Sequence, residues 1–88
     1  MPESLTVTHV PPVEDVLGEF VVTLVLTATA YLEPSDGTEP DIPSAEIALD
    51  VAGGAFDRIR PRLRPEQHAA LSGLLTEARM AVVRKRGT

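Results

Sequence analysis

The sequence predicts an α+β fold, in which a β-hairpin or small antiparallel sheet packs against carboxyl-terminal helices. Three observations lead to this prediction. Residues 19–32 alternate in the manner of a long strand, the last third of the chain carries an apolar stripe with helical spacing, and prolines and glycines separate these segments. We expect residues 1–88 to form a single small domain, because compact folding units contain roughly 50–200 residues.

Two strands are predicted in the first third of the chain. The first covers residues 4–10, where apolar and polar side chains alternate, and Pro11 and Pro12 end it because proline donates no ladder hydrogen bond. The second covers residues 19–32, in which β-branched side chains are abundant. One face of this strand is apolar throughout, and the other, which we expect to be partly exposed, includes Val21, Thr23, Val25 and Thr27.

The length of the second strand predicts a partner. Fourteen residues at about 3.3 Å each span roughly 45 Å, whereas a domain of this size has a diameter of about 30 Å. The first strand covers less than half of this length. Because a bare apolar strand edge favours pairing with another chain, we expect Val21, Thr23, Val25 and Thr27 to contribute to an interaction surface.

The segment that follows the acidic, proline-rich loop of residues 33–43 has two interpretations. A helix over about residues 44–60 would have Ser44 as its amino cap, although Gly53 and Gly54 each disfavour a helix interior by about 1 kcal/mol. Its apolar stripe, at intervals of three and four, would consist of Ala45, Leu49, Ala52, Phe56, Ile59 and Leu63. Alternatively, residues 45–51 alternate as a third strand, which would cover the open edge of the second strand.

The last predicted element is an amphipathic helix over about residues 65–85. Pro65 suits the first turn of a helix, where its missing N–H leaves no bond unmade. Basic residues near the end favour the negative pole of the helix dipole. Its apolar stripe consists of Leu71, Leu75, Ala78 and Val82.

Charge is distributed unevenly along the chain. Residues 1–57 contain eleven acidic side chains and no Lys or Arg, whereas residues 58–88 contain eight basic and two acidic ones. This asymmetry is compatible with pairing within the chain, with attraction to another chain, or with a solvated dipolar surface that has no partner. Clustered arginines also suit phosphate backbones, although a pI near 4.8 opposes nonspecific attraction to nucleic acid. The arginines predicted to take part in interactions are Arg58, Arg60, Arg62, Arg64, Arg84 and Arg86.

Side chains that carry chemistry are scarce. The chain has no cysteine, and its two histidines, His9 and His68, lack the spacing of a metal-binding pair. We therefore expect no catalytic residue, no metal and no cofactor. The predicted function is a noncatalytic protein–protein interaction module: a homo-oligomeric structural component, an adaptor or a small inhibitor. The alternative is a nucleic-acid-binding regulator that uses the carboxyl-terminal arginines.

The expected location is the cytoplasm. The first residues lack the basic and apolar regions of a signal peptide. The longest apolar stretch, residues 20–32, is shorter than the roughly 20 residues that a membrane helix needs. The sequence therefore predicts a soluble protein with no membrane partner.

Overall fold

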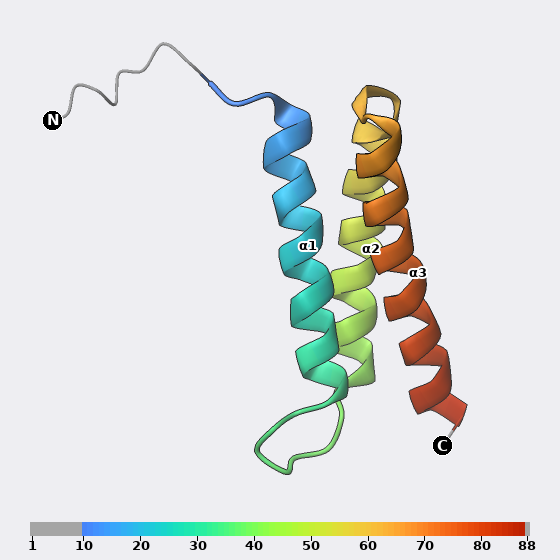
Figure 1. The fold of residues 1–88 in the computed structure, drawn as a ribbon. Coiled ribbons are helices and arrows are strands. Elements are labelled where there is room, and N and C mark those ends of the chain that lie inside the picture. Colours follow the sequence, from blue (N-terminus) through green and yellow to red (C-terminus); the bar gives the residue numbers. More distant parts are fainter. Residues whose placement is uncertain (1–9, 88) are drawn as a thin grey trace, which may run out of the picture.

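The computed structural model describes residues 10–87, and this part of the chain is all-α, without a strand. Helix α1 (Val13–Leu32) is followed by α2 (Ile42–Ile59), the short 3₁₀ helix η2 (Arg60–Arg62) and α3 (Pro65–Gly87). The three long helices lie side by side, and each runs antiparallel to the one before it (Figure 1). The predicted α+β fold is therefore wrong.

The predicted strand over residues 19–32 lies within helix α1. The apolar residues of this segment do not distinguish the period of a strand from that of a helix. Residues between the alternating positions are also mostly apolar or β-branched, so apolar side chains occur at helical spacing as well. A β-branched residue costs a helix less than about 0.7 kcal/mol, whereas full burial of a Val or Leu side chain contributes about 1.5–3 kcal/mol. Packing therefore decides for the helix, and it buries Val21, Val25, Ala28 and Leu32.

Threonine hydroxyls in α1 find partners within the helix. The Thr27 hydroxyl donates to the carbonyl of Thr23 at 2.8 Å, and the Thr29 hydroxyl donates to the carbonyl of Val25 at 3.1 Å. Because these bonds satisfy the hydroxyls locally, threonine is tolerated at positions that strand propensity alone would assign to a sheet.

Helix α2 confirms the helical interpretation of residues 44–60, and the alternative strand over residues 45–51 is wrong. The helix begins earlier than predicted, because Asp41 rather than Ser44 is the amino cap. The Asp41 carboxylate accepts hydrogen bonds from the Ser44 amide at 3.1 Å and from the Ser44 hydroxyl at 2.7 Å. The buried stripe of α2 includes the predicted residues Ala45, Leu49, Ala52, Phe56 and Ile59.

Helix α3 confirms the prediction for residues 65–85 and extends it to Gly87. Pro65 is its first residue, and the Arg64 amide donates to Oε1 of Gln67 at 2.9 Å, which satisfies one amide at the start of the helix. The first predicted strand, residues 4–10, lies outside the described residues except for Val10, which belongs to no helix or strand.

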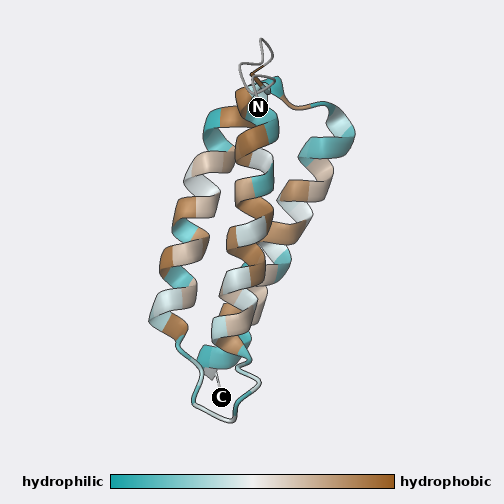
Figure 2. Ribbon diagram, turned by 90° about the vertical axis from the view of Figure 1, so that its left-hand side faces the viewer, coloured by the Kyte–Doolittle hydropathy of each residue, from teal (hydrophilic) through white to brown (hydrophobic). Residues whose placement is uncertain are grey.

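The loop between α1 and α2 is mostly hydrophilic (Figure 2). Gly37 adopts φ +82°, a conformation that other residues rarely take. Next to it, the Asp36 carboxylate accepts hydrogen bonds from the Thr38 hydroxyl at 2.7 Å and from the Thr38 amide at 3.1 Å, and these bonds lower the pKa of Asp36. The predicted loop over residues 33–43 is thus confirmed, except for its last two residues, which begin α2.

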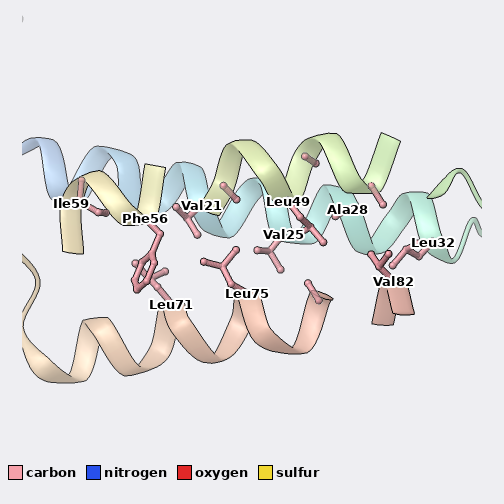
Figure 3. Packing of buried hydrophobic residues seen from close by; sticks show 14 residues of the cluster. Val21, Val25, Ala28, Leu32, Leu49, Phe56, Ile59, Leu71, Leu75 and Val82 are labelled. Carbon is pink, nitrogen blue, oxygen red and sulfur yellow. The ribbon is translucent and has the colours of Figure 1, made fainter. Parts of the chain in front are cut away.

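The hydrophobic core lies on one side of the α1/α2 hairpin. Side chains from both helices point toward α3, as Val21, Val25 and Phe56 do toward Leu71 and Leu75 in Figure 3. Burial of this cluster holds the three helices together, because no polar or charged residue among residues 10–87 is buried with it. The opposite side of the hairpin has no helix against it in this part of the chain.

Candidate interaction surface on the helix hairpin

The structure separates the four residues that were predicted to form an interaction surface on α1. Val21 and Val25 have exposed fractions of 0% and 5%, so they belong to the core and are not accessible to a partner. Thr23 and Thr27 are exposed. The period-two pattern failed here because it grouped side chains that a helix distributes around its axis.

A larger set of exposed apolar side chains lies on the α1/α2 hairpin. On one side of α1 the exposed fractions are 40–50% for Val13, Val16, Phe20 and Tyr31, and on α2 they are 65% for Ile47 and 48% for Val51. Leu26, which is 63% exposed, lies on a different side of α1. Partly buried Leu24 and Ala55 lie among them and pack against the core. We call this surface the outer face; it consists of Val13, Val16, Phe20, Leu24, Thr27 and Tyr31 of α1 and Ile47, Val51 and Ala55 of α2.

The outer face points away from α3. In α1, Val22 lines a groove with Leu71 of α3, and residues two apart in a helix are separated by roughly 200° around its axis, so Phe20 is directed to the other side. In α2, Gly53 lies against the Arg79 guanidinium of α3, so Val51, two residues earlier, is also directed away. Both apolar stripes therefore face the same side of the hairpin.

Contacts at both ends of the hairpin fix the register of the two stripes. Near the start of α1, Glu14 Oε1 lies 3.6 Å from Arg62 Nη1, just after the end of α2. Near the end of α1, the Tyr31 carbonyl accepts a hydrogen bond of 2.9 Å from the Asp41 amide, just before the start of α2. The stripes therefore run beside each other in opposite directions and form one continuous surface.

The outer face is uncharged and large for a chain of this size. An aromatic side chain can bury about 150–250 Å² and an aliphatic one somewhat less, so the six large side chains expose roughly 500 Å² together. This area is near the upper end of the roughly 300–600 Å² of the largest apolar patch on a typical monomer. None of the nine residues that form the outer face carries a charge, and the exposed Arg58, three residues after Ala55 on the same side of α2, lies at its edge.

The arginines are mostly engaged by carboxylates. Arg60 pairs with Asp57, Arg64 Nε lies 3.0 Å from Glu66 Oε2, and Arg86 pairs with Glu46. With the Arg62–Glu14 pair and a Lys85 Nζ–Glu33 Oε2 contact of 3.7 Å, four ion pairs of the described residues join the basic part of the chain to the acidic part. The predicted pairing within the chain is confirmed.

The two arginine groups do not form one basic surface. Arg58 to Arg64 lie where α2 meets α3, whereas Arg84 and Arg86 lie at the other end of α3 (Figure 1). A helix of 23 residues separates the two groups by roughly 30 Å. Arg58 and Arg84 form no ion pair with another described residue. The structure thus disperses the charges that suggested a nucleic-acid contact.

Hollows beside the core include one of about 410 Å³ between α2 and α3, which is lined by Leu49, Val82 and Val83 and by the charged residues Glu46, Asp50, Arg79 and Arg86. Two others lie nearer the start of α3. One, of about 370 Å³, separates the first turns of α1 from α3 and is lined by Gly18, Val22 and Leu71 with Glu14 and Glu19 at its rim. The other, of about 300 Å³, lies between α2 and α3 and is lined largely by polar side chains. Within residues 10–87, no group of three or more His, Asp or Glu side chains is placed to hold a metal ion.

Sequence reasoning missed Phe20, Tyr31, Ile47 and Val51 as candidate surface residues. A signal for the α1 part was present. Val13, Leu17, Phe20, Leu24, Thr27 and Tyr31 follow one another at intervals of four, three, four, three and four, the spacing of a second helical seam beside the buried one.

No family model, curated protein or solved structure matches this chain. By length and composition alone, α1 is the one helix of the described residues that could cross a membrane, and 22% of its most apolar 18-residue window is buried inside the structure. Core helices of soluble proteins have the same length and composition, so the predicted cytoplasmic location stays a prediction. The geometry of the outer face carries the functional argument.

Proposed function

We propose that this protein is a noncatalytic, self-associating helical module in which the outer faces of two copies pack against each other. The observation that carries the proposal is the second apolar face of the α1/α2 hairpin, directed away from α3. The earlier basis for a partner, an unpaired strand edge, does not exist, because residues 19–32 are helical.

The size of the outer face supports a stable contact. Each partner in a standard interface buries about 800 Å². Roughly 500 Å² from the large side chains, together with the surface of Leu24, Thr27 and Ala55 between them, approaches this value. Phe20 and Tyr31 lie on it, and aromatic side chains are enriched at the centre of protein interfaces.

The lack of charge on the outer face supports a second copy as the partner. A two-fold interface places the same patch of both chains together, so any charged residue near the axis would meet its own copy. The outer face avoids this repulsion although the chain has a net charge of −5. Two hairpins packed in this way form a four-helix arrangement with one α3 on each outer side.

Self-association is tested by measuring the mass of the protein in solution by sedimentation velocity from about 5 to about 500 µM. We expect the wild-type protein to become dimeric as concentration rises. Phe20→Glu places a charge in the middle of the outer face and should keep the chain monomeric, with a helical circular dichroism spectrum like that of the wild type.

Met80→Glu is the matched control. Met80 is 50% exposed on α3, close to the 44% of Phe20, and lies outside the outer face, so the variant should dimerise like the wild type. A wild-type monomer over the whole concentration range contradicts the proposal. The proposal is also contradicted if Phe20→Glu and Met80→Glu weaken dimerisation equally. It is contradicted as well if the wild-type protein is monomeric and floats with lipid vesicles, a result that would assign the outer face to a membrane.

A further inference from the structure

The cavity between α2 and α3 carries a second inference, which is independent of the outer face. This cavity of about 300 Å³ is near the lower end of ligand-pocket sizes. It lies on the side of α2 that faces α3, opposite the side occupied by Val51. A ligand bound here would not compete with a second copy on the outer face.

Polar groups of α3 line one wall of the cavity. His68, Ser72, Thr76 and Arg79 follow one another at intervals of four, four and three, so they share one face of the helix. Ser72, Thr76 and Arg79 make no side-chain hydrogen bond or ion pair with another described residue. Two hydroxyls and a guanidinium are thus available to a ligand at this wall.

Gly53 of α2 makes room for the Arg79 guanidinium. A Cβ atom at position 53 would overlap Arg79 Nη2, whereas a Cβ atom at position 54 would meet no other group. The exposed Gly54 has no such neighbour, so a side chain at position 54 would displace nothing, whereas one at position 53 would displace Arg79. The absence of a side chain at Gly53 therefore lets the Arg79 guanidinium lie close to the α2 backbone at the cavity.

The other wall combines a flat apolar surface with a second arginine. The centroid of the Phe56 ring lies 5.3 Å from that of His68, and the Arg60 guanidinium carbon lies 5.3 Å from the Phe56 centroid. Arg60 also pairs with Asp57, which is the one carboxylate lining this cavity. Arg60 offsets the charge of Asp57, so the Arg79 guanidinium gives the residues that line this cavity a net positive charge. Arg79 also lines the neighbouring hollow that contains Glu46 and Asp50.

We infer that this cavity binds the phosphate group of a small phosphorylated molecule. Arginine presents paired N–H donors that match phosphate oxygens, and hydroxyl groups donate further hydrogen bonds to the same anion. Arg79, Ser72 and Thr76 hold the phosphate, and the half-buried His68 ring contacts the rest of the molecule.

The inference is tested by titrating ¹⁵N-labelled protein with inorganic phosphate and with glycerol phosphate at constant ionic strength, with sodium acetate as a carboxylate control. We expect saturable shifts of the amide signals of residues 72, 76 and 79 with both phosphates, and weaker shifts with acetate. Shifts with glycerol phosphate alone identify an ester site, and shifts with both identify a general phosphate site; either outcome supports the inference.

Four variants separate geometry from net charge. Arg79→Gln should weaken phosphate binding by roughly tenfold or more, because it removes a charge-assisted hydrogen-bond donor. Arg58→Gln, which removes the same charge outside the cavity, should change binding by less than about twofold. Gly53→Ala keeps every charge but displaces Arg79, so it should weaken binding several-fold, and Gly54→Ala should not.

Two results would overturn the inference. One is that neither inorganic phosphate nor glycerol phosphate causes saturable shifts of the amide signals of residues 72, 76 and 79. The other is an equal loss of binding in Arg79→Gln and Arg58→Gln, which would show attraction to positive charge in general. Thermal unfolding of each variant confirms that it is folded, and both glycine variants should be at least as stable as the wild type, because alanine favours a helix over glycine.

Discussion

Helices α1 and α3 have similar lengths but differ in the polarity of the surface that they expose to water. Helix α3 has one buried stripe, formed by Leu71, Leu75, Ala78 and Val82. Its remaining surface carries polar and charged side chains together with the separate exposed residues Leu74, Met80 and Val83. Helix α1 also has one buried stripe, but from Phe20 to Leu32 it contains no charged residue. The difference indicates that α3 is built for a single apolar neighbour, whereas α1 is built for apolar neighbours on two sides.

Two neighbouring leucines of α3 test most clearly whether this helix has a single buried side. Leu75 has an exposed fraction of 2% and Leu74 one of 38%. We expect Leu75→Ala to lower the free energy of unfolding by about 2–5 kcal/mol, because it removes buried methyl groups and leaves a cavity. Leu74→Ala should lower it by less than about 1 kcal/mol. Urea denaturation followed by circular dichroism measures both, and similar losses would show that α3 has no single buried side.

A smaller difference in stability is expected from the first turns of α1 and α3. The first residue before α1 is Pro12, which provides no side-chain cap, whereas Gln67 accepts a hydrogen bond from the Arg64 amide at the start of α3. Gln67→Ala should lower the free energy of unfolding by about 0.5–1.5 kcal/mol, the net value of one hydrogen bond.

The control for this variant is Gln67→Glu, which keeps an acceptor at the same position and adds a negative charge near the positive end of the helix dipole. Its free energy of unfolding should equal or exceed that of the wild type. If Gln67→Glu destabilises as much as Gln67→Ala, the capping role of this side chain is wrong.

The same contrast explains which elements could be predicted from the sequence. The α3 stripe was predicted residue by residue, because polar and charged residues between its apolar positions, among them Ser72, Thr76 and Arg79, favour the helical period. In α2, five predicted stripe residues are buried, although alternation in residues 45–51 left a strand open. In α1, apolar residues on all sides concealed the period, and threonines and valines favoured a strand by propensity.

The candidate surface was predicted only in part. Thr23 and Thr27 are exposed on α1 as expected, whereas Val21 and Val25 are in the core. Ile47 and Val51 could not be assigned to the same surface as Phe20 from sequence alone, because this requires knowing that α1 and α2 form a hairpin with α3 on one side. The polar cavity likewise depends on the register of α2 against α3, which places Arg79 over Gly53.

The three aromatic residues of the chain allow a direct test of where two copies meet. Phe20 and Tyr31 are 44% and 40% exposed on the outer face, whereas Phe56 is 6% exposed in the core. In a sample that mixes ¹³C-labelled and unlabelled protein, isotope-filtered nuclear Overhauser spectra detect only contacts between different chains. These spectra, recorded at a concentration where the protein is dimeric, separate the two faces of the hairpin.

We predict interchain signals from the ring protons of Phe20 and Tyr31 to methyl groups of the outer face, including those of Ile47 and Val51. Phe56 should give none, because its ring contacts side chains of its own chain. Interchain signals from the Met80 methyl group of α3, with none from Phe20 or Tyr31, would contradict the claim that the second apolar face of α1 is covered by another copy.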